Sequence, residues 1–341
     1  MVSQPDPAPT GDVGAHPAAP SAVGAAPSPL GPALAGPGIR SCGAPATGAA
    51  MTLPAALIEP LLRAWLAEDL GRGDLTAPAL AGRRGRGAWF AKGDGVFCGG
   101  VLVEPLFRLL DPAVAVRLLV ADGETVLAGQ RLLHLEGQAA ALVAGERTAL
   151  NLAMRLSGIA TATAALVAEL AGTGVRLADT RKTTPGLRLL EKYAVRCGGG
   201  VNHRLGLDDA AMLKENHLAW SGGIGPAIAA VRASAPWPAR VIVEAETEAE
   251  AKAAVLAGAD AVLLDEFSPE ALAALVPRLR ALAAERMVAG GTGSLVLEAS
   301  GVRPEQLRAY GATGLDLIST SAPITRSAWL DLSMRFEPVL I

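Results

Sequence analysis

The spacing of hydrophobic positions changes along the chain. Between residues 54 and 70 apolar side chains recur at helical intervals, which predicts an amphipathic helix that ends in a Gly/Asp-rich loop. Residues 86–136 instead carry short apolar stretches separated by glycine and aspartate, a pattern typical of short strands and turns. We therefore expect a small α+β domain in this part of the chain.

A long helix is predicted next, over residues 141–172, with a break near Gly158. From residue 175 onward, short apolar strands alternate with helical patterns. The strands are predicted over 175–180, 211–217, 240–246, 261–267, 294–300 and 315–320. Repeated strand–helix units of this kind indicate a parallel sheet.

Each of these strands ends on polar or charged residues. In a βα barrel the carboxyl ends of the strands form the active-site face, whereas the interior below them is packed with aliphatic side chains. A Rossmann-type sheet would need a glycine fingerprint after its first strand, but the glycine run 198–200 follows a helix. We therefore predict a barrel. The strand-end residues are Asp179, Arg181, Lys214, Glu244, Asp265, Glu298 and Ser300.

Residues 1–50 have a different composition from the rest. They are rich in Pro, Ala, Gly and Ser and show neither helical nor strand spacing of apolar residues. They therefore offer too little apolar surface to offset the entropy of ordering. We expect a disordered tail without the features of a signal peptide. Met51 resembles a natural start, and we hypothesise that translation begins there or that the tail is dispensable. Loss of activity on deleting it would contradict this.

The overall composition narrows the class of protein. The chain has 341 residues, 51% of them hydrophobic, which is ample for a large core. Its formal net charge of −3 does not suggest a general nucleic-acid binder, and we find no charge-free apolar run of about 18 residues, so no membrane span is expected. Cys42, Cys98 and Cys197 are scattered and odd in number. They fit neither a disulfide framework nor a zinc cluster, and indicate a reducing cytoplasm.

One segment is strongly cationic. Between Val175 and Arg204 there are seven Lys or Arg residues and only two acids. Guanidinium and ammonium groups bind carboxylates and phosphates. Glu244 and Asp265, at neighbouring strand ends, suit Mg²⁺ held largely through phosphate oxygens, although structural ion pairs are the alternative. The pattern favours a small anionic substrate together with a magnesium-bound phosphorylated one.

Several other residues have structural interpretations. Arg188, Lys192 and Arg196 recur at helical spacing, which favours a solvated helix face. The glycines at 198–200 fit a helix cap and turn as well as a functional loop. Packing roles are expected for His134 and Cys197, and the role of His217 is left open.

The segment "DTRKTTPGLRLLEKYAVRCGGGVNHRLGL" strongly resembles the quinolinate phosphoribosyltransferases, as do "ERTALNL", "RLSGIATAT" and "LKENH" around it. The resemblance covers about residues 55–338. It implies an α/β fold in which an incomplete, open βα barrel follows an N-terminal α+β sandwich domain. The implied divisions are a tail over 1–50, the sandwich over 51–150, the barrel over 151–320, and a segment over 321–341 that packs back on the sandwich.

The resemblance also implies a reaction. Enzymes of this family transfer phosphoribosyl from phosphoribosyl pyrophosphate to quinolinate with decarboxylation, and so make nicotinate mononucleotide for NAD synthesis. By position, Lys182, Glu244 and Asp265 would be catalytic, and the two acids would also hold Mg²⁺. The substrate-binding residues would be Arg147, Thr180, Arg181, His203, Arg204, Lys214, Ser300, Gly301 and Ser321. Arg147 would serve the partner's site in a homodimer or in a hexamer of dimers.

Some residues depart from the family pattern, mainly near the implied 5′-phosphate site. Val302 and Ser321 replace glycines, Arg326 replaces a histidine, and Glu266 replaces an asparagine. The alternatives are a molybdenum-transport-associated paralogue, a nicotinate or nicotinamide phosphoribosyltransferase, and a non-catalytic anion-binding protein. The number of cations favours a dicarboxylate substrate, and acids beside an anionic ligand argue against simple binding.

Overall fold

The computed structural model of the chain describes residues 53–288 and 294–338. The described residues all belong to one compact unit. The predicted tail over 1–50 and Cys42 lie outside them.

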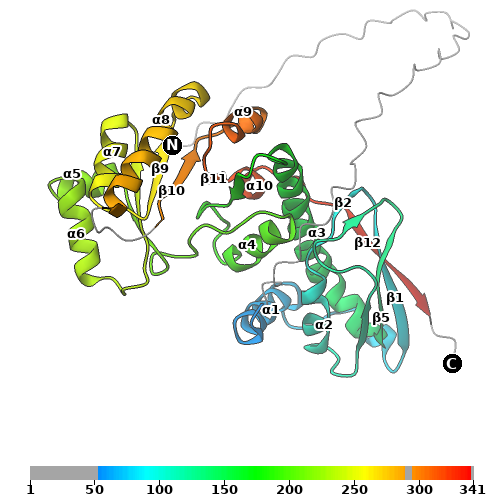
Figure 1. Ribbon diagram of the computed structural model, residues 1–341. Coiled ribbons are helices and arrows are strands. Elements are labelled where there is room, and N and C mark those ends of the chain that lie inside the picture. Colours follow the sequence, from blue (N-terminus) through cyan, green and yellow to red (C-terminus); the bar gives the residue numbers. More distant parts are fainter. Residues whose placement is uncertain (1–52, 289–293, 339–341) are drawn as a thin grey trace, which may run out of the picture. The chain divides into compact units, whose positions relative to one another are not determined.

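The N-terminal part is built on an antiparallel sheet whose strands, within the described residues, have the order β12-β1-β5-β3. The last described strand, β12, pairs with residues 85–91 of the first strand, so the first and last strands of the described chain share one sheet (Figure 1). Its strands are β1 (Arg84–Ala91), β3 (Ala115–Leu118), β5 (Arg131–Gln138) and β12 (Leu332–Pro338). A separate pair joins β2 (Gly95–Val96) to β4 (Thr125–Val126).

Helices supply the rest of this core. The predicted first helix is α1 (Ala55–Leu70), and its buried Ile58, Leu62 and Leu66 pack into the core that contains Trp89 of β1. A helix that the sequence pattern did not reveal, α2 (Gly100–Arg108), lies between β2 and β3. The strands expected over 86–136 are present, but they are interrupted by this helix.

The second sheet is parallel, and its described strands have the order β6-β11-β10-β9-β8-β7. A parallel bridge between Ala178 and Val201 extends it beyond β6. The strands are β6 (Arg176–Ala178), β7 (Ala211–Leu213), β8 (Val241–Ala245), β9 (Ala261–Asp265), β10 (Val296–Ser300) and β11 (Leu317–Ser319). This confirms the predicted strand series and the incomplete barrel, except that the strand expected over 211–217 stops at Leu213.

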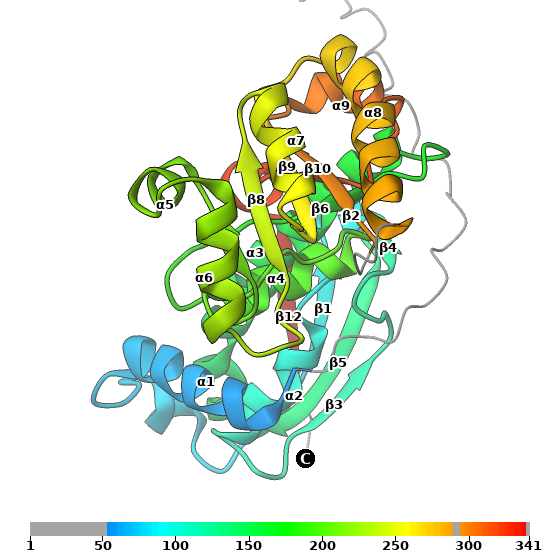
Figure 2. The same ribbon diagram turned by 60° about the vertical axis from the view of Figure 1, so that its left-hand side comes forward.

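Helices cover the outer face of this sheet (Figure 2). The helices of this half are α4 (Arg188–Cys197), α5 (Glu215–Trp220), α6 (Ile224–Ser234), α7 (Glu248–Leu256), α8 (Pro269–Val288), α9 (Leu307–Gly311) and α10 (Ala322–Thr325). In β8, Val241, Val243 and Ala245 pack toward the helices, whereas Ile242 belongs to a small apolar cluster on the opposite face. Because side chains alternate along a strand, Glu244 lies on that interior face, beyond Ile242.

The long helix α3 (Ala139–Glu169) is continuous, so the predicted break near Gly158 is wrong. Gly158 has a packing role instead, because a Cβ atom there would lie 2.1 Å from the carbonyl oxygen of Ala328. Among the described residues, α3 alone is long and apolar enough to cross a membrane, but 44% of its most apolar window is buried in this fold, as in a core helix.

The division into domains stays a prediction. The helix α3 runs through the boundary expected at residues 150 and 151, and it contacts β1, β5 and β12 as well as α4 and β6. Residues of α3 and α4 also share one apolar core with the N-terminal sheet.

The close approach at Gly158 can be tested by adding one methyl group. We expect Gly158→Ala to lower the free energy of unfolding by about 2 kcal/mol or more, because the backbone at Ala328 has to move. The matched control is Gly225→Ala in α6, where no atom lies within 4 Å of the added Cβ and alanine is the better helix former. Equal stability of the two variants in urea denaturation would contradict this packing.

Candidate active site

The carboxyl ends of neighbouring strands bring four of the predicted residues together in pairs. Lys214, directly after β7, places its Nζ atom 2.5 Å from Oε2 of Glu244 on β8. The Ser300 hydroxyl at the end of β10 donates a hydrogen bond to the carboxylate of Asp265 on β9. The structure therefore places a cation, two acids and a hydroxyl next to one another along one edge of the sheet.

The backbone beside Asp265 is unusual. Glu266 has a φ of 56°, in the left-handed region that costs a residue with a side chain about 1–2 kcal/mol. Asparagine, which stands here in the resembling family, tolerates this conformation better. Gly301 also has a positive φ, and a Cβ atom there would lie 3.9 Å from Oδ1 of Asp265. Strained backbone of this kind is common at functional sites.

His203 has both ring nitrogens engaged within the chain. Its Nδ1 accepts a hydrogen bond of 2.8 Å from the backbone N–H of Arg204, so the ring proton lies on Nε2. Nε2 is 3.3 Å from Oε2 of Glu298, a buried residue of β10. The other carboxylate oxygen of Glu298 has no hydrogen-bond partner among the described residues. For its ring nitrogens to bind a substrate carboxylate, His203 has to turn away from Glu298.

Arg181 and Arg204, from different segments, are electrostatic neighbours. Partial burial lowers the pKa of the Arg204 guanidinium, and the positive charge of Arg181 lowers it further, while Asp209 acts in the opposite direction. Arg204 also donates a hydrogen bond of 2.8 Å to the carbonyl oxygen of Ala210, just before β7. Guanidinium groups bind carboxylates, so two that influence each other suit a ligand with two negative charges.

A buried network positions these side chains. The Lys192 ammonium donates to the Asp179 carboxylate and, at 3.0 Å, to the carbonyl oxygen of His203. Asn202 and the His203 N–H also donate to Asp179, at 2.6 and 2.8 Å. Burial raises the pKa of Asp179 and lowers that of Lys192, in each case against the effect of the partner's charge. The backbone from which His203 and Arg204 project is thus held by an ion pair.

This network corrects the interpretation of α4 as a solvated basic face. Lys192 is fully buried, with 0% of its surface exposed, and only Arg196 is exposed as expected. Arg188 is half-buried and joins two loops, since it donates to the Thr183 hydroxyl at 3.0 Å and to the Leu205 carbonyl at 3.2 Å. Helical spacing alone could not separate these three positions.

Besides Asp179, a second acid is buried: Glu191 on helix α4, whose structural role the sequence did not predict. Glu191, next to Lys192 on α4, accepts hydrogen bonds of 2.8 and 2.9 Å from the backbone N–H and the hydroxyl of Thr184. It also forms an ion pair of 2.8 Å with Arg155 on α3. Arg155 also donates to the carbonyl oxygen of Ile324 at 2.6 Å. This arrangement ties the loop that follows Lys182 to α3 and to the C-terminal segment.

The glycines at 198–200 are required by packing. A Cβ atom on Gly198 would lie 2.4 Å from the carbonyl oxygen of Ala160 in α3, and one on Gly200 would lie 2.7 Å from Val195. The run therefore allows α4 to end against α3, which favours the structural interpretation. His217 is likewise accounted for locally, because its Nδ1 accepts the Lys214 N–H at the start of α5.

The remaining predicted residues have few contacts with these networks. Thr180 accepts the Lys182 N–H at 3.0 Å, and the side chains of Arg181 and Lys182 are exposed. Ser321 precedes α10. Val302, expected near a phosphate loop, is buried in the helix-side core.

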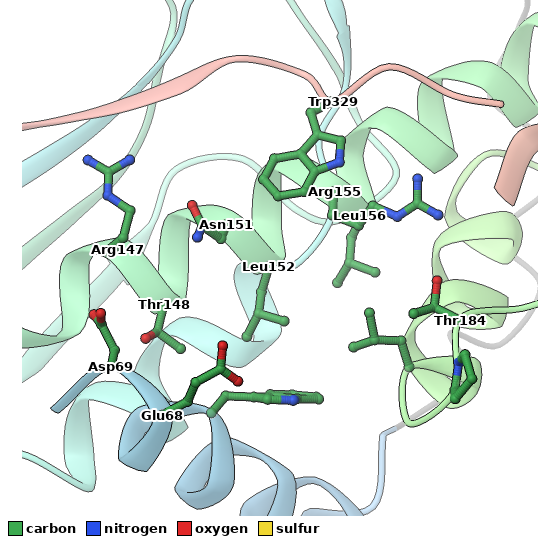
Figure 3. Close-up of a pocket in the computed structure, with 13 residues that line it drawn as sticks. Glu68, Asp69, Arg147, Thr148, Asn151, Leu152, Arg155, Leu156, Thr184 and Trp329 are labelled. Carbon is green, nitrogen blue, oxygen red and sulfur yellow. The ribbon is translucent and has the colours of Figure 1, made fainter. Parts of the chain in front are cut away.

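Arg147 lies apart from the strand-end residues. It projects from α3 at one end of a groove of about 540 Å³, with its guanidinium group turned away from Leu156 and Thr184 (Figure 3). Its side chain is 63% exposed, and its nearest acid is the adjacent Glu146, at 3.7 Å. Other residues that line the groove are Trp65, Asn151, Arg155 and Trp329.

The cysteines are scattered in the sequence, but two of them meet in the fold. Cys98 and Cys197 lie side by side, with Asp122 as a common neighbour. Local sequence patterns could not predict this contact, because 98 residues separate the two cysteines in the chain.

Comparison with known proteins gives a consistent result. The chain matches the family models "Quinolinate phosphoribosyl transferase, N-terminal domain" over residues 74–157 and "Quinolinate phosphoribosyl transferase, C-terminal domain" over residues 159–335. It is 43% identical to a "Probable nicotinate-nucleotide pyrophosphorylase" (carboxylating) of Synechocystis, over 83% of this chain and 93% of that protein. It is also 35% identical to the human "Nicotinate-nucleotide pyrophosphorylase" (carboxylating), over 85% of this chain and 95% of that protein.

Solved structures agree with this result. The structure of NadC from Streptococcus pyogenes matches with a TM-score of 0.77 and 36% identity, over 84% of this chain and 99% of that one. A human nicotinic acid phosphoribosyltransferase matches with a TM-score of 0.53 at only 16% identity, which shows a shared fold alone.

The buried ion pair under the site can be tested directly. We expect Lys192→Met to lower the free energy of unfolding by about 3–5 kcal/mol, because it leaves the Asp179 carboxylate buried without its counter-charge. Arg196→Met, on the exposed side of the same helix, should change stability by less than about 0.5 kcal/mol. Chemical denaturation of both variants measures the difference, and similar effects would refute the role given to Lys192.

Proposed function

The chain belongs to the quinolinate phosphoribosyltransferase family, and we propose that it transfers phosphoribosyl from phosphoribosyl pyrophosphate to quinolinate with loss of CO₂. The products are nicotinate mononucleotide, pyrophosphate and CO₂. One observation carries the proposal: the carboxyl ends of neighbouring barrel strands gather a lysine, two acids and a hydroxyl, and the positive charge of Arg181 acts on Arg204 from a separate segment.

Quinolinate is a pyridine with two carboxylates, which suits the two guanidinium groups. Arginine binds a carboxylate through two parallel hydrogen bonds, so each guanidinium can hold one of them. Lys214 can exchange its ion pair with Glu244 for a carboxylate of the substrate. His203, once turned away from Glu298, adds a further donor.

The phosphoribosyl donor belongs at the other side of Lys214. Glu244 and Asp265 are oxygen ligands of the kind that hard divalent cations prefer, and Mg²⁺ usually keeps waters and substrate phosphates as its remaining ligands. Bound Mg²⁺ would carry part of the charge of the departing pyrophosphate. Ser300, Gly301 and Ser321 are proposed to contact the 5′-phosphate.

Electrostatics explains why such a site is needed. Both substrates are anions that repel each other in water, and the cations hold them at reacting distance. The ring nitrogen bonds to the anomeric carbon as the bond to pyrophosphate breaks, while Glu244 stabilises the positive charge that develops on the ribose. Lys182 is proposed to lie between the two substrates.

Decarboxylation then needs little help from the protein. The ring nitrogen has become positively charged, so it stabilises the electron pair that stays on the adjacent carbon when CO₂ leaves. That carbon then takes up a proton. The role of the side chains is to orient the leaving carboxylate and to keep the dianion bound until this step.

We further propose a cytoplasmic homodimer in which Arg147 completes the partner's site. This is supported by the exposed position of Arg147 on α3, beside a groove that includes none of the strand-end residues.

The reaction is tested by incubating the chain with quinolinate, phosphoribosyl pyrophosphate and Mg²⁺, and measuring nicotinate mononucleotide and CO₂. In Arg204→Ala we expect KM for quinolinate to rise about 100-fold or more, because a charged contact to a dianion is lost, with little change in KM for the phosphoribosyl donor. Arg196→Ala is the matched control and should behave like wild type. Turnover of nicotinate at a similar rate would contradict the proposed substrate.

The shared site is tested by mixing two inactive variants. At a quinolinate concentration near the wild-type KM, Arg147→Ala and Arg204→Ala should each show almost no activity alone. In a mixed dimer, one site receives an intact Arg147 and keeps an intact Arg204, so random assembly should restore about a quarter of wild-type activity. If Arg147 serves its own chain instead, the mixture stays inactive.

A further inference from the structure

Three side chains of types that can hold a metal ion lie together outside the proposed active site. Cys98 follows β2, Asp122 precedes β4, and Cys197 is the last residue of α4. Their ligand atoms, two sulfurs and a carboxylate oxygen, all lie within 4.8 Å of one another. We propose that they form a structural site for a thiophilic divalent cation of the zinc class.

The separation of the donors suits such an ion. For three atoms no more than 4.8 Å apart, a common point exists within about 2.8 Å of each of them. Zinc needs about 2.3 Å to a thiolate and about 2.0–2.2 Å to a carboxylate oxygen. Shifts of roughly half an ångström per side chain would therefore complete three bonds, and a water molecule can supply the fourth.

The carboxylate is oriented toward this role. Asp122 accepts two hydrogen bonds. The backbone N–H of Gly100, at the start of α2, donates one of 2.8 Å, and the Tyr193 hydroxyl donates one of 2.9 Å. Each bond goes to a different oxygen, so each oxygen keeps a lone pair for a cation. Hydrogen-bonded outer groups of this kind hold a ligand in place.

The surroundings favour soft donors. Cys98 is fully buried beside Phe97, and its backbone N–H and carbonyl both bond to the Ser157 hydroxyl of α3. A divalent cation binds the deprotonated sulfurs, so it would displace the protons of both thiols. Cys197 and Asp122 are only half-buried, which gives the ion a way in.

The backbone is shaped for close approach at each ligand. All three are followed by glycine in the sequence, at Gly99, Gly123 and Gly198. Gly99 and Gly123 have positive φ, and a Cβ atom on Gly123 would lie 3.2 Å from the carbonyl oxygen of Cys197. A cation here would tie α4 to the β2–α2 loop. It would thereby stabilise the helix that carries Lys192.

Cobalt provides the probe, because thiolate ligands give Co²⁺ an intense charge-transfer absorption that oxygen ligands do not. The full chain, metal-free and kept reduced with a phosphine, should bind one Co²⁺ with this absorption and lose it when Zn²⁺ is added. An ion at Glu244 and Asp265 would not produce the band, so this result is independent of the proposed function. Zn²⁺ in excess should raise Tm by roughly 5 °C.

The cysteine variants identify the ligands. Cys197→Ser and Cys98→Ser should lose both the band and the rise in Tm, whereas Cys42→Ser should keep them. Circular dichroism checks that the variants are folded, and the half-buried Cys197 gives the safer variant. The proposal is overturned if wild type shows no thiolate band, if folded Cys197→Ser retains it, or if the reduced chain binds no Co²⁺ while the untreated chain carries a Cys98–Cys197 disulfide.

Discussion

The arrangement of the site depends on one buried ion pair, Lys192 with Asp179. The pair is removed from water, and such pairs persist only when further hydrogen bonds satisfy both partners. Asn202 and the backbone of His203 supply those bonds here. The same contacts hold the backbone of 202–204, so the groups that satisfy the buried charge also orient the side chains proposed to bind substrate.

Helix α4 connects this ion pair to the rest of the molecule. One side of the helix belongs to the apolar core of the N-terminal sheet, through Leu190, Tyr193 and Val195. Its buried acid Glu191 bonds to Arg155 of α3, and its half-buried Arg188 bonds two loops of the site. The packing of the N-terminal part therefore determines where the barrel's binding loops lie. The proposed cation site at the end of α4 would act on the same connection.

The groups at the strand ends form ion pairs and hydrogen bonds with one another. Lys214 pairs with Glu244, Ser300 with Asp265, and His203 with Glu298. These internal pairs lower the cost of gathering so many charges at one place, and substrate binding would exchange some of them. Glu298 is the least satisfied of these groups, since one of its oxygens is buried without a partner among the described residues.

The sequence by itself determined the alternation of strands and helices in the second half of the chain, the parallel sheet and the polar residues at the strand ends, because these follow from local periodicity and from the alternation of side chains. Its motifs also indicated the family. The tertiary structure decided which helix faces are covered. Lys192 is buried, Gly158 is needed for close packing, and Cys98 meets Cys197, each because a distant segment packs against it. Local spacing carries no information about such a segment, so burial and long-range contacts could not be read from the pattern.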